Sequence, residues 1–225
     1  MLVHPWDAAL DDEEWRHFVA EQGFGQLIAA GRDREIPVVV PTQYVLDGDH
    51  VVLHLARPNP VWRAIAENPI VLLSVAGDWA FVPSGWKAIG SEDPALGIPT
   101  TYYAAAQLVC EATVVDDAEG KLAILRRQLG ALEPDGSAAD PSAHRARLAG
   151  IRGLLLAIRD VTAKFKYGGN VDTEHRRAVA ERLTERGTRS DLLARTHLLR
   201  RLDAESAHGD AGEADQVGRG DFSAF

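Results

Sequence analysis

The spacing of apolar residues predicts a helix near the start of the chain. Trp15, Phe18 and Val19 recur at helical intervals behind a run of four acids, and Gly23 follows as a stop signal. We therefore expect a helix over residues 11–21. By the same criteria, further helices are expected at 59–67, 118–132, 142–149, 172–186 and 190–200.

Between these helices the chain consists of short β-branched or aromatic segments separated by glycine and aspartate turns. The expected strands are 24–30, 36–46, 51–55, 70–75, 79–83, 105–115 and 153–167. Gly77-Asp78 predicts a hairpin, and 133–141 has the composition of a loop. Strands in hairpin order with helices at corners and ends favour a mainly β, α+β fold. We expect a small closed antiparallel barrel rather than a parallel α/β sheet.

Composition adds a division of the chain into a folded part and a tail. With 225 residues, 46% apolar and 25% charged, the chain can bury one sizeable core. Its last 23 residues hold six acids and one base, with few apolar side chains. Such a segment buries too little apolar surface to offset its ordering entropy. We therefore expect a folded domain over 1–202 and an acidic, disordered tail over 203–225.

Charge and cysteine content exclude several classes of protein. A formal net charge of −9 argues against general binding to nucleic acid or anionic membranes, which needs a basic surface. No apolar run approaches the ~20 residues of a membrane-spanning helix, and the N-terminus lacks the pattern of a signal peptide. Cys110, the single cysteine, cannot form an internal disulfide. These features predict a cytoplasmic protein.

The segment from His54 to Pro60 is the first candidate for chemistry. A predicted strand ends there and delivers His54, Arg57 and a helix start at Asn59 within a few residues. The helix start and the arginine could bind an anion, and the imidazole could ligate iron or contact a cofactor. The alternative is a hydrogen-bonded structural histidine beside a surface arginine.

Lys164 and Lys166 are the second candidate, because strand alternation places both on one face. They could bind a cofactor phosphate or propionate, and burial of one could favour a neutral amine for catalysis or metal ligation. The alternative is a solvated lysine pair that protects a sheet edge.

A third group of residues could line a pocket. Hydroxyl-bearing Thr100, Thr101, Tyr102 and Tyr103 stand at the entrance to a strand, and Trp86 could form the wall for a planar cofactor. They could equally be loop residues packed on the barrel. We interpret the other histidines as structural or solvent-facing, and Cys110 as a small buried hydrophobe.

Taken in order, these segments resemble the PaiB family over about residues 1–183. The matching pieces are GFGQL from Gly23, VPT from Val40, HLARPNP from His54 with Trp62, FVPS from Phe81 with Trp86, IPT from Ile98 with Tyr103, and KFK from Lys164 with Asn170. Members of this family are FMN-binding proteins, often negative transcriptional regulators, and adopt a split β-barrel of antiparallel strands as homodimers. The resemblance implies the same fold and assembly here.

Two segments depart from the usual family pattern. Where relatives have KFKLSQN this chain has KFKYGGN, so that Tyr167, Gly168 and Gly169 replace Leu, Ser and Gln. The segment PTTYYAAAQL also differs from the family's usual tryptophan-asparagine pair. Together they look like the branch that makes piperazate, in which the barrel holds haem b. That branch converts N5-hydroxy-L-ornithine to L-piperazic acid by forming an N–N bond, with loss of water and no net redox change.

This resemblance implies a role for each candidate residue. His54 is expected to be an axial haem ligand, and Lys166 or Lys164 a displaceable amine ligand or proton donor on the opposite face. Arg57 would pair with a haem propionate, and Thr100, Thr101, Tyr102 and Tyr103 would orient an amino-acid substrate. The other residues expected at the cofactor are Asn59, Trp86 and Asn170. The double glycine could make room for the macrocycle or for the substrate.

Other functions stay open at this point. The first alternative is an FMN-binding PaiB-like oxidoreductase or negative regulator. Others are a haem-binding or haem-degrading barrel without amino-acid chemistry, and a non-enzymatic acidic dimer that binds another regulator. Direct DNA binding through the arginine-rich segment 176–201 is the least favoured, because such arginines are more typical of a solvated helix face or a dimer contact.

Overall fold

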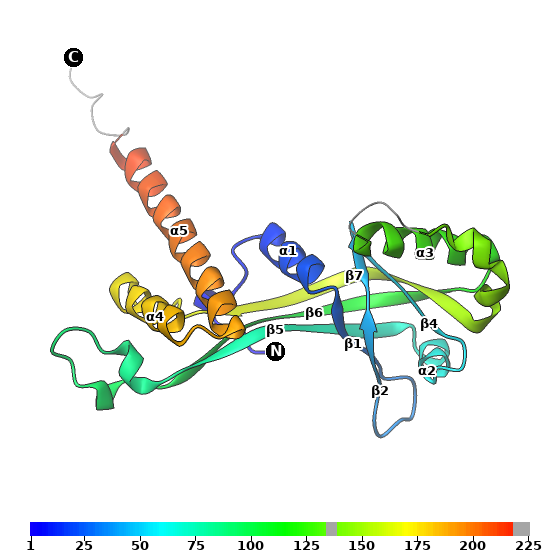
Figure 1. The fold of residues 1–225 in the computed structure, drawn as a ribbon, viewed down its shortest axis with the longest axis horizontal. Helices are drawn as coiled ribbons and strands as arrows, with labels where there is room; N and C mark the ends of the chain where they lie inside the picture. The colour runs from blue at the N-terminus through cyan, green and yellow to red at the C-terminus, as the bar shows by residue number, and fades with distance from the viewer. Residues whose placement is uncertain (134–138, 218–225) are drawn as a thin grey trace, which may run out of the picture. The chain divides into compact units, whose positions relative to one another are not determined.

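The computed structural model describes residues 1–133 and 139–217 of the chain (Figure 1). The strands are β1 (Phe24–Ala29), β2 (Val38–Gln43), β3 (Val45–Asp47), β4 (His50–Ala56), β5 (Ile70–Val82), β6 (Thr100–Val115) and β7 (Ile151–Lys166). The α-helices are α1 (Asp12–Gln22), α2 (Val61–Glu67), α3 (Ala118–Leu132), α4 (Thr173–Arg186) and α5 (Arg189–Val217). Short 3-10 helices are η1 (Pro5–Asp7), η2 (Ser84–Lys87), η3 (Pro94–Leu96) and η4 (Pro141–Gly150).

In the described chain the strands form one seven-stranded sheet in the order β2-β1-β5-β6-β7-β4-β3. The pairings of β1 with β2 and β5, and of β4 with β3 and β7, are all antiparallel. Helices stand between strands and at the C-terminal end (Figure 1). The predicted mainly β, α+β fold with antiparallel strands is therefore confirmed.

The chain divides into two compact units, each with its own core. The first unit contains Met1–Val3, Ala8–Gly77 and Ala105–Lys164, and the second contains His4–Asp7, Asp78–Ala104 and Phe165–Phe225. Fully buried side chains of the first unit include Leu27, Leu53, Leu73, Leu108 and Leu154. Those of the second include Val82, Tyr102, Phe165, Leu183 and Leu198. Strands β5, β6 and β7 contribute residues to both units.

Aspartate caps define several helix starts. The Asp11 carboxylate accepts a hydrogen bond from the Glu14 N–H at 2.8 Å, which satisfies a donor that the first turn of α1 leaves free. Gly23 ends α1 in the left-handed region at φ +55°, as its position predicted. In the same way the Asp117 carboxylate accepts from the Gly120 N–H at 2.8 Å at the start of α3. Helices α1 and α3 are confirmed.

Three predicted strand boundaries are wrong. The hairpin expected at Gly77-Asp78 does not form, because the backbone stays extended through Gly77 and β5 runs unbroken. The single strand expected over 36–46 is two strands separated by Tyr44, whose buried hydroxyl donates to Val19 O of α1 at 2.7 Å. Strand β6 begins at Thr100 rather than at Ala105, so the predicted pocket residues lie within the sheet.

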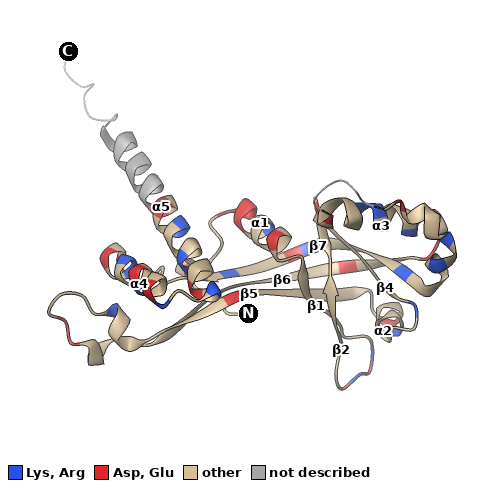
Figure 2. Cartoon of the chain, viewed as in Figure 1, with Lys and Arg blue, Asp and Glu red and all other residues tan. Residues whose placement is uncertain are grey.

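Helix α5 continues to Val217, so the structure describes residues 203–217 as helical, where a disordered tail was expected from Asp203. Arg176 of α4, whose side chain is buried, donates to Glu205 of α5 at 3.1 Å. Alanine and glutamate in this stretch are also strong helix formers. Figure 2 shows acids and bases on both helices. The rest of the predicted tail, 218–225, and most of the predicted loop, 134–138, lie outside the described residues.

Candidate functional site

The predicted site residues lie in both units. His54, Arg57, Asn59 and Lys164 belong to the first unit. Trp86, Thr100, Thr101, Tyr102, Tyr103, Lys166 and Asn170 belong to the second. Each group is described within its own unit below.

His54 has the surroundings of a metal-ligating histidine. It lies in β4 opposite Gly153 of β7, and its Nδ1 is 2.6 Å from Oε1 of Gln128 in α3. An amide oxygen can only accept a hydrogen bond, so Nδ1 is the donor, and in the neutral imidazole Nε2 carries the lone pair. No described residue is hydrogen-bonded to Nε2. Metal-bound histidines commonly donate their other N–H to such an acceptor, so His54 could hold a metal through Nε2.

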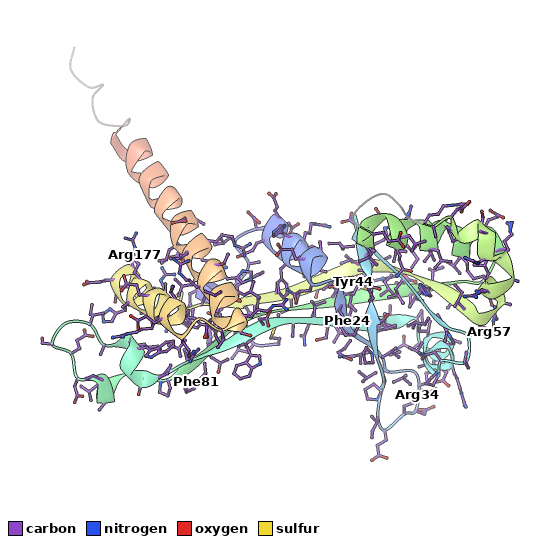
Figure 3. All side chains as sticks on the ribbon, viewed as in Figure 1. Phe24, Arg34, Tyr44, Arg57, Phe81 and Arg177 are labelled. Carbon is purple, nitrogen blue, oxygen red and sulfur yellow. The ribbon has the colours of Figure 1, made fainter. Side chains whose placement is uncertain are left out.

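Arg57 follows β4 and is already paired (labelled in Figure 3). Its guanidinium donates to both oxygens of Asp116, at 2.5 and 3.0 Å, and to Ala149 O at 2.6 Å. Lys121 and Arg152 also donate to Asp116, each at 3.1 Å. Hydrogen bonds from Arg57 and then Lys121 hold the pKa of Asp116 well below its usual range. The side chain expected at a propionate therefore has a carboxylate partner within the protein.

Asn59 acts as a local cap. Its side-chain oxygen accepts from the Val61 N–H at 3.0 Å, and α2 has only seven residues. One of the free N–H groups at this helix start, that of Val61, therefore already has a partner within the protein.

Tyr102 is the centre of the second group. Its side chain is 1% exposed, and its hydroxyl has no hydrogen-bond partner in the described part of the chain. Burial raises its pKa to about 12, and the nearby Arg176 opposes that shift. Its ring meets Tyr167 edge-on at a centroid distance of 5.9 Å, and Tyr167 stacks on His197 at 5.2 Å. Tyr102 is therefore a neutral phenol with one unused polar atom.

The space beside the double glycine is occupied by the protein itself. Gly168 has φ +77°, and a Cβ built on it would lie 2.5 Å from the Tyr102 hydroxyl oxygen. A Cβ on Gly169 would overlap Trp6 O. The two glycines leave room for the Tyr102 hydroxyl and for Trp6 O. They do not leave the open space for a macrocycle that the sequence had suggested.

The two lysines of β7 have different surroundings. Lys164 is 8% exposed and donates to Leu2 O at 3.1 Å. Lys166, two residues further along β7, is half-buried, and its ammonium makes no hydrogen bond or ion pair with the described residues. Burial of Lys87 in η2 and then the charge of Lys166 lower the pKa of Lys87. Lys166 is thus the better placed of the two for chemistry.

The other predicted residues border this group. Thr100, Thr101 and Tyr103 are half-buried on β6, and Asn170 is exposed in the turn after Gly169. The ring of Trp86 lies 4.4 Å from the guanidinium carbon of Arg186. One face of the proposed cofactor wall is therefore covered by an arginine.

Sequence reasoning missed several residues that the structure brings to these groups. Gln128 is 5% exposed on the face of α3 that includes Lys121 and Ile124, and a polar residue at such an apolar spacing was the available signal. Lys87 and His197 carried no comparable signal. Cys110 is buried, which confirms the prediction of a small buried hydrophobe, and burial raises its pKa to about 12.

The described residues contain neither a cluster of metal-ligating side chains nor a helix that could span a membrane. No group of three or more His, Cys, Asp or Glu side chains is arranged to hold a metal ion. No helix in that part of the chain is both long and apolar enough to cross a membrane.

Comparison with known proteins identifies the family and the fold. A family model described as "Putative FMN-binding domain" matches residues 1–160. The FAD and haem binding protein from Mycobacterium smegmatis has a TM-score of 0.56 at 20% identity, covering 76% of this chain and 79% of that one. The flavocytochrome Anf3 from Azotobacter vinelandii has a TM-score of 0.56 at 19% identity, covering 77% and 75%. These likenesses show the split-barrel fold. No curated protein matches the chain.

Proposed function

The chain belongs to the FMN-binding domain family, and within it we propose that this protein is a haem b-dependent piperazate synthase. The proposed reaction is the cyclisation of N5-hydroxy-L-ornithine to L-piperazic acid. The observation that carries the proposal is the packing of Tyr102 against Gly168 in the second unit.

This packing joins the two segments in which the chain departs from the usual family pattern. Tyr102 belongs to PTTYYAAAQL and Gly168 to KFKYGGN. A side chain at 168 would collide with the Tyr102 hydroxyl, so Tyr102 in this position needs a glycine at 168. The departures are therefore one physical unit, which supports the resemblance to the piperazate branch as a whole.

The surroundings of His54 support haem as the cofactor. Its Nε2 lone pair is available, and Gln128 fixes the tautomer. The fold also accommodates haem, since one protein that shares it binds both FAD and haem. When bound, haem supplies an iron Lewis acid, which withdraws electrons from a hydroxylamine and weakens its N–O bond.

The chemistry needs no external oxidant or reductant. The α-amine attacks the hydroxylamine nitrogen, an N–N bond forms, and the N–O electron pair leaves on oxygen. The α-nitrogen then loses one proton, which balances the proton that the departing hydroxide takes up to form water, and the ring is left neutral. We assign Lys166 the role of donating a proton to the departing oxygen, and Thr100, Thr101 and Tyr103 the role of orienting the substrate.

FMN is the alternative cofactor, and the family description favours it. In that case the protein would be an FMN-binding oxidoreductase or a PaiB-like negative regulator. Flavin and haem have different absorption spectra, so the two proposals separate in one experiment.

We also propose that the protein is a cytoplasmic homodimer. Trp79 of β5 is 64% exposed and Phe81 (labelled in Figure 3) is 47% exposed, both in the second unit. Large aromatic side chains are enriched at subunit interfaces. The single buried Cys110 suits a reducing compartment. Light scattering of the purified protein should give twice the chain mass, and the double variant W79S/F81S should give the monomer.

The test of the cofactor is an absorption spectrum of the full chain purified from cells supplied with a haem precursor. We expect a Soret band that shifts on reduction with dithionite. The variant His54→Ala should change that spectrum, whereas His50→Ala, in the same strand, should not. A spectrum unaltered in His54→Ala would remove the ligand assignment, and a bleachable pair of flavin bands would favour FMN.

A further inference from the structure

The loop over residues 84–97 in the second unit forms an open surface cavity that the site described above does not include. The cavity has a volume of about 360 Å³ and is lined by Lys87, Ala88, Glu92, Asp93, Leu96 and Gly97. This volume lies within the range of small-molecule sites, about 300–1,000 Å³. The loop that forms it lies beside α4 (Figure 1).

Contacts within the loop fix the walls of the cavity. A Cβ on Gly97 would overlap Ser84 O, so the two ends of the loop are in close contact. Glu92 accepts from the Ile89 N–H at 3.0 Å, and Asp93 accepts from the Ala95 N–H at 2.9 Å. These contacts hold the two ends of the loop together and fix the backbone at Ile89 and Ala95.

His175 of α4 is bonded to Glu92, a residue that lines the cavity. His175 Nε2 lies 2.9 Å from Glu92, and its Nδ1 lies 2.7 Å from Asp172. Hydrogen bonds to Asp172 and then Glu92 raise the pKa of His175, which favours its charged form. Glu92 therefore already has a cationic partner and is not the acid that a ligand would meet first.

One cation and one carboxylate oxygen of the lining are left to bind a ligand. The Lys87 ammonium makes no hydrogen bond or ion pair with the described residues, and burial and then the charge of Lys166 lower its pKa. Asp93 uses Oδ1 as the cap for Ala95, and Oδ2 has no hydrogen-bond partner in the described chain. An anion at Lys87 would favour the charged form of that lysine and so oppose both influences.

We propose that this cavity binds the zwitterionic head of an amino-acid substrate, with Lys87 holding its α-carboxylate and Asp93 its α-ammonium. The proposal rests on the proposed function and adds the binding site that it lacks. Lys87, which lines the cavity, is influenced by the charge of Lys166, the lysine assigned to proton transfer. The α-ammonium must lose a proton to become the nucleophile, and the Asp93 carboxylate is the group that we assign to accept it.

Two simpler ligands suit the lining less well. A phosphate or other simple anion would face the carboxylates of Glu92 and Asp93 as well as Lys87. A metal cation would face the Lys87 ammonium. A molecule that carries both charges satisfies both sides of the cavity.

The test is calorimetric titration of the cofactor-free full chain with L-ornithine as the probe. We expect Lys87→Met and Asp93→Asn each to weaken binding at least about tenfold, and Lys87→Arg to retain it. Glu35→Gln, which removes one exposed charge from the first unit, is the matched control and should bind as the unmodified chain does. Putrescine, which lacks the carboxylate, should bind weakly and without dependence on Lys87. 5-Aminopentanoate, which lacks the α-amine, should lose its dependence on Asp93.

Absence of ornithine binding, or binding that survives both Lys87→Met and Asp93→Asn, would overturn the proposal. The absorption spectrum of haem-loaded samples separates this failure from failure of the proposed function. If the chain takes up haem and forms product but ornithine does not bind at Lys87, the inference fails and the proposed function stands. Ornithine binding that depends on Lys87 and Asp93 in a chain that takes up no haem would keep the inference and remove the function.

Discussion

Tyr44 of the first unit and Tyr102 of the second are both 1% exposed, and they differ at the hydroxyl. The Tyr44 hydroxyl donates to Val19 O at 2.7 Å, whereas the Tyr102 hydroxyl has no partner among the described residues. Figure 3 labels Tyr44. A buried polar group without a partner costs free energy, so it indicates a group with a role other than stability.

The charged groups of the two units show the same contrast. In the first unit, Arg57, Lys121 and Arg152 all donate to Asp116. In the second unit, Lys87 and Lys166 repel each other, and neither has an acidic partner in the described chain. Asp116 of the first unit is therefore satisfied by its own contacts, whereas Lys87 and Lys166 of the second are charged groups that a ligand would satisfy.

The largest expected effect breaks the packing at Gly168. Gly168→Ala should lower the free energy of unfolding by roughly 2–4 kcal/mol, because it adds a left-handed alanine and a clash with Tyr102. Gly48→Ala, also at positive φ but with nothing within 4 Å, should lose only about 1–2 kcal/mol. In the double variant Gly168→Ala/Tyr102→Phe, the loss in free energy of unfolding measured in urea should be close to that of Gly48→Ala. Equal losses for the two single glycine variants would contradict the packing argument.

The two tyrosines give the next effect. Tyr44→Phe should lower the free energy of unfolding by about 1–3 kcal/mol, because Val19 O loses its donor. Tyr102→Phe should leave stability unchanged or raise it, since its hydroxyl has no partner to lose. Thermal unfolding of both variants measures the difference. A loss in Tyr102→Phe as large as that in Tyr44→Phe would show that the hydroxyl is bonded after all.

Acid stability sharpens the comparison of charges. Hydrogen bonds from Arg186 and then Thr188 lower the pKa of Asp191 in the second unit to about 2. A carboxyl with a depressed pKa contributes stability above its unfolded value of about 3.9, and loses it as the pH falls toward 2. Asp191→Asn should therefore cost about 1–2 kcal/mol at pH 6, after allowance for the partial exposure of Arg186.

The difference between Asp191→Asn and the unmodified chain should vanish by about pH 2 in urea titrations. The lowered pKa of Asp116 in the first unit should leave both proteins acid-sensitive. A difference that grows as the pH falls would have the wrong sign for this account.

The smallest expected effect concerns the ion pair between His175 of α4 and Glu92 of the loop. A raised pKa means that the ion pair with Glu92 is fully present below about pH 6.5 and is lost as the pH rises through the raised value. Amide protection over residues 88–93 should therefore fall between about pH 6 and pH 9 in the unmodified chain. In His175→Gln it should be low and constant. Amide protection that does not change with pH in either protein would show that His175 does not hold this loop.

The sequence predicted most elements but few of their partners. Helices α1 and α3 follow from local spacing and aspartate caps, which act within one turn. The hairpin at Gly77-Asp78 was wrong because residues 70–82 stay in one strand of the sheet, and sheet pairing is not local.

The candidate site divides in the same way. His54, Tyr102 and Lys166 were recognisable from sequence motifs, but Gln128 lies 74 residues from His54 and only the fold brings them together. The altered residues Tyr102 and Gly168 were each visible in the sequence. Only the fold shows that a side chain at position 168 would collide with the Tyr102 hydroxyl.

The most direct measurement is the conversion of N5-hydroxy-L-ornithine by the purified full chain, loaded in parallel with haem b and with FMN and given no oxidant or reductant. We expect L-piperazic acid from the haem-loaded chain only, with formation lost in Lys166→Met and kept in Glu35→Gln. The absence of product from a chain that has taken up haem, or product from the FMN-loaded chain, would contradict the proposed function.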